Sequence, residues 1–243
     1  MALRFHVPNI PKNSDAFLLP QNTIKHINVL RLKNGTEITL FDGSGSEFNA
    51  ILDIQNKNSF IAKITNQQNI SRESSLQIIL IQAVSTGEKM DFTVQKATEL
   101  GVSEIYPVIT ERSNVRLSGE RAEKRRNRWQ EIAISACEQC GRNIIPNIRA
   151  VEPLNNVLNN LPSADRYILL SPKGSLKLNA IKDIPQKVVL LIGAEGGFSQ
   201  EEDNSANKAG FVPITLGQRI LRTETAGLAT ISSLQTLWGD FAS

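Results

Sequence analysis

Two apolar runs constrain the fold of this chain more than any other feature. They lie at residues 76–84 and 188–192, the second within a strand expected at 187–192. Neither run alternates regularly between apolar and polar residues, as a strand with one solvated face would. Helical patterns follow them, at 89–100 and 199–209. Strands buried on both faces that alternate with helices are typical of a parallel sheet. The chain from residue 73 onward is therefore expected to form an α/β domain with a mostly parallel sheet.

The rest of this domain continues the alternation of strands and helices. Ser199 and Glu202 have the spacing of a capping box, which favours a helix start at Ser199. Gly101 and Gly141 are placed to end two of the helices. Further strands are expected at 104–109, 166–170 and 211–216, and further helices at 118–140 and 223–238.

The first 72 residues have a different pattern, in which short alternating segments are separated by turn residues. Asn34-Gly35 predicts a hairpin turn, because both residues tolerate a positive φ. Residues 66–75 are polar and are expected to form a linker. Short strands at this spacing favour a small β-barrel, so we expect two domains, 1–72 and 73–243. The predicted strands are 36–41, 47–54 and 60–64, with a turn at 42–45.

The positive charge of the chain is unevenly distributed. The net charge is only +3, but residues 1–72 carry eight basic and five acidic residues, so the whole excess lies there. Between residues 112 and 128 there are seven basic and two acidic residues. A basic module and a basic helix are a plausible footprint for nucleic acid, although a solvated surface explains the same pattern. The second cluster consists of Arg112, Arg116, Arg121, Lys124, Arg125, Arg126 and Arg128.

Several protein classes do not fit the sequence. The apolar runs are too short to span a bilayer, and residues 1–6 do not resemble a secretory signal. Two cysteines cannot form a disulfide framework, so we expect a cytoplasmic protein that does not contact membranes. Cys137 and Cys140 form a single Cys-x-x-Cys without a second ligand pair, and we expect no metal site.

The segment at 193–199 is the strongest local candidate for a binding site. It follows a buried strand, contains three glycines and leads into a capped helix. Ligands of open parallel sheets bind beyond the carboxyl ends of the strands, where glycines allow the backbone to come close. The segment matches neither a Walker A motif nor a dinucleotide fingerprint. A tight strand-to-helix turn would also account for it.

A second segment, at 216–226, again lies between a strand and a helix. Thr223 could cap that helix, and Glu224 would sit favourably in its first turn. Arg219, Arg222 and Glu224 are close together in sequence, which also fits a surface ion pair. Two such loops after consecutive strands favour a shared pocket.

Segments 193–199 and 216–226 closely resemble the signature motifs of the RsmE family, bacterial 16S rRNA uridine-N3 methyltransferases of the SPOUT superfamily. Residues 4–5 and 26–31 resemble the small PUA-like barrel of that family. The similarity covers essentially the whole chain. Ala194 departs from the pattern, because the family usually has proline there. Further agreement lies at 90–102, 111–113 and 128–146.

The resemblance implies a fold and a cofactor. Residues 1–72 would form a PUA-like β-barrel, and residues 73–243 a SPOUT domain with a trefoil-knotted, mostly parallel sheet and flanking helices. It also implies a homodimer with active sites near the subunit interface, and S-adenosylmethionine as the methyl donor. The residues implied to hold the cofactor are Ser171, Pro172, Gly193, Ala194, Glu195, Gly196, Gly197, Leu216, Gly217, Ile220, Leu221, Arg222, Thr223 and Ala226.

Methylation of uracil N3 makes specific chemical demands. The nitrogen carries a weakly acidic proton, so a general base, or a cation that stabilises the anionic ring, assists the reaction. Arg222 is the candidate for stabilising charge on the uracil carbonyls. Glu195 and Glu224 are candidate bases or orienting groups, with solvent as an alternative proton acceptor.

The implied partner is 16S rRNA of the small ribosomal subunit, with a target uridine in the decoding region that has to turn outward to react. Three alternatives remain: a catalytically inactive rRNA-binding assembly factor, a SPOUT methyltransferase acting on tRNA, and a Rossmann oxidoreductase, which lacks its fingerprint. The candidates for contacting RNA are Arg4, His26, Arg31, Lys33, Lys89, Lys96, Arg112, Arg116, Arg121, Lys124, Arg125, Arg126 and Arg128.

Overall fold

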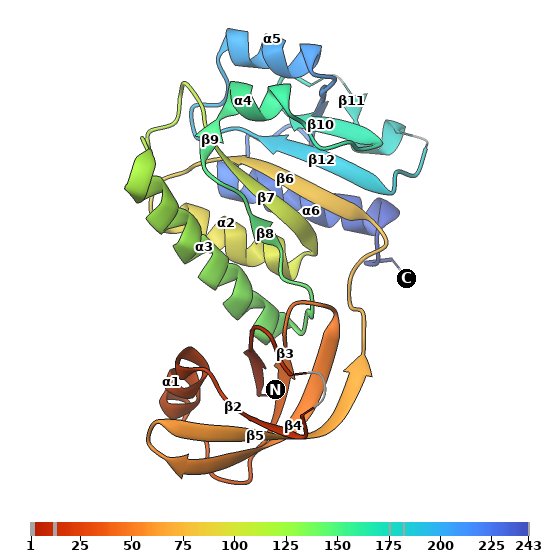
Figure 1. The fold of residues 1–243 in the computed structure, drawn as a ribbon. Coiled ribbons are helices and arrows are strands. Elements are labelled where there is room, and N and C mark those ends of the chain that lie inside the picture. Colours follow the sequence, from red (N-terminus) through yellow and green to blue (C-terminus); the bar gives the residue numbers. More distant parts are fainter. Residues whose placement is uncertain (1–2, 12–13, 175, 182, 243) are drawn as a thin grey trace. The chain divides into compact units, whose positions relative to one another are not determined.

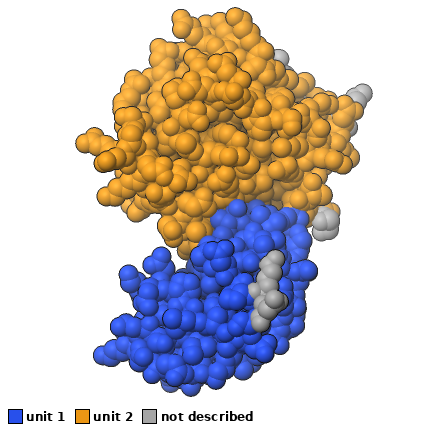
Figure 2. All heavy atoms as spheres, in the orientation of Figure 1, with its two compact units in different colours: residues 1–73, 137–145 blue, residues 74–136, 146–243 orange. Residues whose placement is uncertain are grey.

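The computed structural model describes residues 3–11, 14–174, 176–181 and 183–242. They form two compact units, which Figure 2 colours separately. Unit 1 contains residues 1–73 and 137–145, and unit 2 contains residues 74–136 and 146–243. Unit 1 therefore includes the C-terminal end of a helix that begins in unit 2.

Unit 1 is built on a five-stranded sheet in the order β1-β3-β4-β5-β2 (Figure 1). β1 runs parallel to β3, and the other neighbours pair antiparallel. The strands predicted at 36–41, 47–54 and 60–64 are confirmed, whereas α1 was not foreseen. Ile24 and Ile27 of α1 are buried against the sheet with Phe5, Leu40 and Phe48. The elements are β1 (Arg4–His6), β2 (Ala16–Leu18), α1 (Gln21–Val29), β3 (Glu37–Phe41), β4 (Ser46–Asn56) and β5 (Ser59–Asn69).

Two local predictions for this unit were wrong. Asn34-Gly35 is not a hairpin turn, because it connects α1 to β3, and of the two residues only Gly35 has a positive φ, of 81°. The segment 66–75 is not wholly a linker, because β5 continues to Asn69, which pairs with Ser46. Backbone pairing does not require apolar side chains, so an exposed strand can be entirely polar.

A cluster of polar groups around the buried carboxylate of Glu47 holds the segment 137–145 within unit 1. The carboxylate of Glu47 accepts hydrogen bonds from Arg4 (2.8 Å), Arg72 (2.9 Å) and Asn143 (3.2 Å). Asn143 also accepts a 2.6 Å hydrogen bond from Arg4 and donates to the carbonyl of Ile70. Burial alone would raise the pKa of Glu47, but the hydrogen bonds from Arg72, Arg4 and Asn143 outweigh burial and lower the pKa to about 2.

We predict that Glu47→Gln destabilises unit 1 in a pH-dependent way. Because the pKa of Glu47 is depressed in the folded chain, its contribution is complete above the ordinary pKa of 4.5 and is lost as the pH falls toward 2. That shift corresponds to about 3 kcal/mol. Amide hydrogen exchange of β3–β5, normalised to intrinsic rates, should give a stability difference between wild type and variant that shrinks below pH 4.5. A difference that is constant from pH 7 to pH 3 would contradict the assignment.

Unit 2 is built on a sheet in the order β11-β13-β10-β12-β6-β7-β8, with β9 pairing alongside β7. Every neighbouring pair in this sheet is parallel, so the predicted parallel sheet is confirmed. Its strands are β6 (Gln77–Ala83), β7 (Val102–Ile109), β8 (Asn147–Ile148), β9 (Glu152–Pro153), β10 (Arg166–Leu170), β11 (Leu176–Lys177), β12 (Lys187–Ile192) and β13 (Val212–Thr215). Its helices are α2 (Glu88–Glu99), α3 (Gly119–Cys140), α4 (Leu154–Asn159), α5 (Gln200–Lys208) and α6 (Thr223–Trp238), with a 3-10 turn at Leu178–Ala180.

Helices cover both faces of this sheet, which is why its central strands β6 and β12 are mostly apolar. α2, α3 and α6 lie on one face, and α4 and α5 on the other (Figure 1). Along β6, Ile78 and Leu80 pack into the core that contains α2, α3 and α6. Ile79 and Ile81 pack into the core that contains α4 and α5. Side chains of a strand point alternately to its two faces, so each apolar run supplies both cores.

The long elements of unit 2 agree with the sequence predictions, and the short ones were missed. β10, β12 and α6 have the predicted bounds. Ser199 and Glu202 form the predicted capping box at the start of α5. The missed elements, α4, β8, β9 and β11, have two to six residues each. Within the described ranges, no helix is long and apolar enough to cross a bilayer.

Candidate functional site

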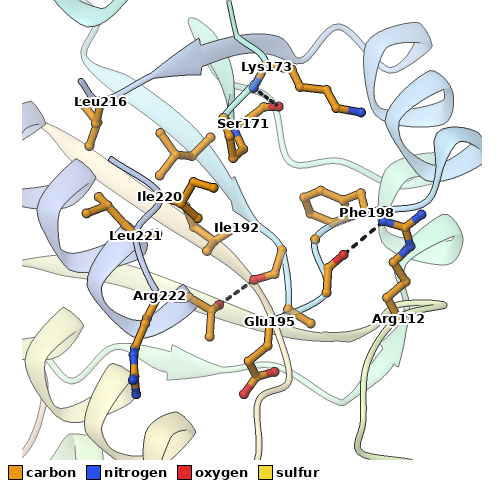
Figure 3. Close-up of a pocket in the computed structure, with 18 of the residues that line it drawn as sticks. Arg112, Ser171, Lys173, Ile192, Glu195, Phe198, Leu216, Ile220, Leu221 and Arg222 are labelled. Atoms are coloured by element: carbon orange, nitrogen blue, oxygen red, sulfur yellow. Dashed lines mark hydrogen bonds between the residues drawn. The ribbon is translucent and has the colours of Figure 1, made fainter. Parts of the chain in front are cut away.

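A pocket lies at the carboxyl ends of three neighbouring strands of unit 2, namely β10, β12 and β13. Because the strands are parallel, the loops that follow them meet at one edge of the sheet. These loops enclose most of a cavity of about 560 Å³ (Figure 3). The residues that line the cavity are Lys89, Arg112, Leu170, Ser171, Pro172, Lys173, Ile192, Gly193, Ala194, Glu195, Gly196, Gly197, Phe198, Asp203, Thr215, Leu216, Arg219, Ile220, Leu221, Arg222, Thr223 and Ala226.

The glycines of the loop after β12 are required by close packing and by backbone conformation. A Cβ atom added to Gly193 would lie 3.0 Å from the ring of Phe198, and one added to Gly196 would lie 3.0 Å from the Cβ of Arg112. Gly197 has a φ of +67° and donates a hydrogen bond to the carbonyl of Ala194. At its glycines, the loop therefore brings backbone rather than side chains to the cavity wall.

Hydrogen bonds fix the loops to their neighbours. The hydroxyl of Thr223, at the start of α6, donates a 2.5 Å hydrogen bond to the carbonyl of Gly193 (Figure 3). On the other side of the cavity, the amide of Ser171 donates to the carbonyl of Ile214 of β13. The hydroxyl of Ser171 accepts from the amide of Lys173. These hydrogen bonds within the chain hold the loops around the pocket in place.

Charged side chains stand around the cavity. The ammonium of Lys89 lies 3.0 Å from a carboxylate oxygen of Glu195, and Arg112 donates to the carbonyl of Gly196. Arg222 is exposed, and its guanidinium makes no hydrogen bond or ion pair with the described part of the chain. Burial tends to raise the pKa of Glu195, but the hydrogen bond from Lys89 and backbone hydrogen bonds leave the pKa below its ordinary value. Glu195 is therefore ionised at neutral pH. Arg222 is a cation available to a ligand, as are Lys173 and Arg219, which also line the cavity and are exposed.

The predicted catalytic residues separate into two groups. Arg222 and Glu195 line the cavity, and Figure 3 shows their side chains on the same side of it. Glu224 does not line the cavity, and its Oε2 atom is buried without a hydrogen-bond partner in the part of the chain that the structure describes.

Of the fourteen residues implied to hold a cofactor, only Gly217 lies outside the cavity lining. It lines a second hollow of about 660 Å³ beside α6, together with Thr236 and Leu237. Two further lining residues, Phe198 and Arg219, lie within the candidate segments 193–199 and 216–226. Five lining residues were missed. Three of them end the strands before the loops, so strand-end position was the usable signal, whereas nothing pointed to Lys173 or Asp203. The three strand ends are Leu170, Ile192 and Thr215.

The structure divides the candidate RNA-contacting residues by their availability. The guanidinium of Arg4 is buried, holds Glu47 and stacks over Phe41 at 5.1 Å, so it does not reach solvent. Lys89 and Arg112 line the cavity. A second group is already paired with acids: His26 with Glu138, Lys96 with Glu99, Arg126 with Glu123 and Arg128 with Asp91. The remaining candidates are exposed and have no acidic partner in the described chain. They are Arg31, Lys33, Arg116, Arg121, Lys124 and Arg125.

No group of three or more potential metal ligands from His, Cys, Asp and Glu occurs among the residues that the structure describes. Cys137 is buried and burial raises the pKa of its thiol to about 12, which makes it a poor metal ligand or nucleophile at neutral pH.

Comparison with known proteins decides the family. Residues 72–235 match the RNA methyltransferase domain, and residues 19–65 match the RNA methyltransferase PUA domain. The chain is 39% identical to the ribosomal RNA small subunit methyltransferase E of Buchnera aphidicola from Acyrthosiphon pisum over 232 residues, which cover 94% of this chain and 90% of the relative. The chain belongs to this methyltransferase family. The resemblance found in the sequence motifs is confirmed.

Solved structures of family members agree with this result. The methyltransferase E of Neisseria gonorrhoeae, bound to S-adenosyl methionine, is 44% identical, with a TM-score of 0.93 over 99% of this chain and 100% of that one. A methyltransferase of Legionella pneumophila, also in complex with S-adenosylmethionine, is 38% identical, with a TM-score of 0.94 over 99% of this chain and 100% of that one. The fold predicted from the sequence, a SPOUT-type parallel sheet with flanking helices and a PUA-like β-rich N-terminal domain, is confirmed.

Proposed function

We propose that this family member is an S-adenosylmethionine-dependent methyltransferase that methylates N3 of one uridine in the decoding region of 16S rRNA. Residues 1–72 would bind RNA, and residues 73–243 would form the catalytic domain with its trefoil knot. The observation that carries the proposal is the pocket at the ends of β10, β12 and β13. Two loops that carry the family motifs line one cavity together with the loop after β10. A structural neighbour that is 44% identical to this chain binds S-adenosyl methionine.

The residues present fit S-adenosylmethionine. The cavity volume lies in the range of small-molecule sites. Leu170, Ile192 and Leu216 offer apolar surface to an adenine ring, and the glycine loop offers backbone groups to polar atoms. Ala194, where the family usually has proline, contributes its carbonyl to the turn with Gly197, and proline would keep that carbonyl. When bound, the cofactor supplies an electrophilic methyl group.

The side chains at the cavity then have distinct tasks. The Arg222 guanidinium stabilises negative charge on the uracil carbonyls as the N3 proton leaves. Glu195 is a weak proton acceptor because its pKa is lowered, and its ion pair suits it to positioning Lys89. The proton from N3 passes to solvent, because Glu224, the other candidate base, does not line the cavity and its Oε2 is buried.

RNA contacts follow from the exposed basic residues. Arg121, Lys124 and Arg125 lie on α3, are exposed and have no acidic partner within the described residues. We propose that they bind rRNA phosphates, as do Arg31 and Lys33 of unit 1. Such contacts position the RNA without reading its sequence. A homodimer, implied by the sequence resemblance, and a cytoplasmic location, expected from the two cysteines, complete the proposal.

The competing interpretations differ in testable ways. An inactive assembly factor has no reason to keep an ordered cofactor pocket, so binding of S-adenosylmethionine counts against it. A methyltransferase of tRNA would bind the cofactor but would label a different RNA. The test incubates the purified chain with methyl-labelled S-adenosylmethionine and either small ribosomal subunits or tRNA. Label on N3 of a 16S rRNA uridine supports the proposal, and label confined to tRNA contradicts it.

In the same assay, Arg222→Ala should reduce methyl transfer by about 10²–10³-fold, the effect of removing one group that stabilises transition-state charge. Its affinity for S-adenosylmethionine, measured by calorimetry, should stay near that of the wild type. Full activity of the variant would remove Arg222 from the mechanism.

Charge reversal on α3 tests the RNA surface. Arg125→Glu should weaken RNA binding and reduce the slope of log K against log salt by about one, because one phosphate contact is lost. Arg126→Glu is the matched control, because Arg126 is already paired with Glu123. Equal slopes for the wild type and Arg125→Glu would exclude Arg125 from the RNA contact.

A further inference from the structure

Gln82 is a buried polar residue whose place next to the pocket the proposed mechanism does not explain. It lies in β6, one residue before the strand ends, and its side chain is fully buried. It does not line the cavity. Its amide nitrogen donates to Thr223 Oγ1 (3.0 Å), which belongs to α6 and is 141 residues away in sequence.

The chemistry of the neighbouring atoms fixes the direction of each hydrogen bond. The carbonyl of Ala83 can only accept, so the atom of Gln82 that lies 3.1 Å from it must be the amide nitrogen. The carbonyl of Gly193 can also only accept, so the single hydroxyl proton of Thr223 points to it. The Thr223 oxygen must then accept from Gln82. Two hydrogen bonds therefore run in the same direction, from Gln82 to Thr223 and from Thr223 to Gly193, and we call this pair the relay.

This relay is costly for the fold, which indicates that it has another purpose. Gln82 Oε1 is buried and has no hydrogen-bond partner in the described residues. Gly227 leaves little room beside it, because an added Cβ would lie 3.3 Å from that oxygen. A buried carbonyl oxygen without a partner is destabilising, whereas an apolar side chain of the same size would not be. Stability alone therefore does not account for glutamine here.

We propose that Gln82 is a positioning residue for the cofactor loop. By occupying the acceptor site of Thr223, it directs the Thr223 proton to Gly193 and so holds the loop 193–197 against the first turn of α6. Loss of the amide frees the hydroxyl to rotate, and the loop loses its fixed place in the cavity wall. This inference rests on the proposed function, because it takes S-adenosylmethionine as the ligand of the cavity.

The test is Gln82→Met, which keeps the unbranched shape and removes the amide. We expect S-adenosylmethionine affinity, measured by calorimetry on the full chain, to fall about tenfold, the effect of one buried hydrogen bond to a fixed loop. The melting temperature of the variant should equal or exceed that of the wild type, because methionine lacks the buried oxygen that has no hydrogen-bond partner. A merely structural residue would instead lower the melting temperature and leave the affinity unchanged. Thr98→Val is the matched control: Thr98 is fully buried in α2, and its hydroxyl donates to the carbonyl of Val94.

Thr223→Val removes the hydroxyl that takes part in both hydrogen bonds of the relay. The test therefore does not depend on the folding of a single variant. The affinity of Thr223→Val for S-adenosylmethionine should fall to a similar extent. The double variant should bind no more weakly than either single variant. Thr223→Ser, which keeps the hydroxyl, should bind nearly as tightly as the wild type. Unchanged affinity in Gln82→Met, or additive losses in the double variant, would overturn the inference. A wild-type chain that fails to bind S-adenosylmethionine would overturn the proposed function itself, and the inference with it.

Discussion

The parallel sheet of unit 2 buries both of its faces, and this constraint determines where a ligand can bind. Apolar side chains of β6 and β12 point alternately into the two cores, so neither face is open. A ligand can then bind only beyond the ends of the strands, and in open parallel sheets it binds beyond the carboxyl ends. β10, β12 and β13 contribute loops to that edge, although they are dispersed along the chain. The site is thus a consequence of strand order.

The loops can form a binding surface only if their backbone is both close to the cavity and fixed. Closeness comes from glycine, since side chains at Gly193 and Gly196 would meet Phe198 and Arg112. Fixation comes from hydrogen bonds such as that from Thr223 to Gly193. A pocket ordered before binding loses less conformational entropy when a ligand enters, which favours a precise reaction geometry. The charged groups, Arg222 and the Lys89–Glu195 pair, lie at one side of this cavity.

Much of this arrangement could be predicted from local sequence signals. The capping box of Ser199 and Glu202 and the apolar strand β12 are local, so the loop between them was located correctly. The helices that were missed, such as α1 and α4, are short. Their buried apolar residues have helical spacing, but they extend over only one turn in each helix, which is too little for a pattern to stand out in the sequence. Tertiary contacts between distant residues could also not be predicted from the sequence. A charge count could not show that Arg4 is buried against Glu47, and no spacing links Gln82 to Thr223.

The central claim is that this pocket serves the methylation of one uridine of 16S rRNA. The most direct test maps modified uridines in 16S rRNA from cells that lack the gene, beside cells in which the gene has been restored. The account predicts the loss of a single N3-methyluridine in the decoding region, and its return with the wild-type gene. An unchanged pattern of N3-methyluridine in the cells without the gene would contradict it.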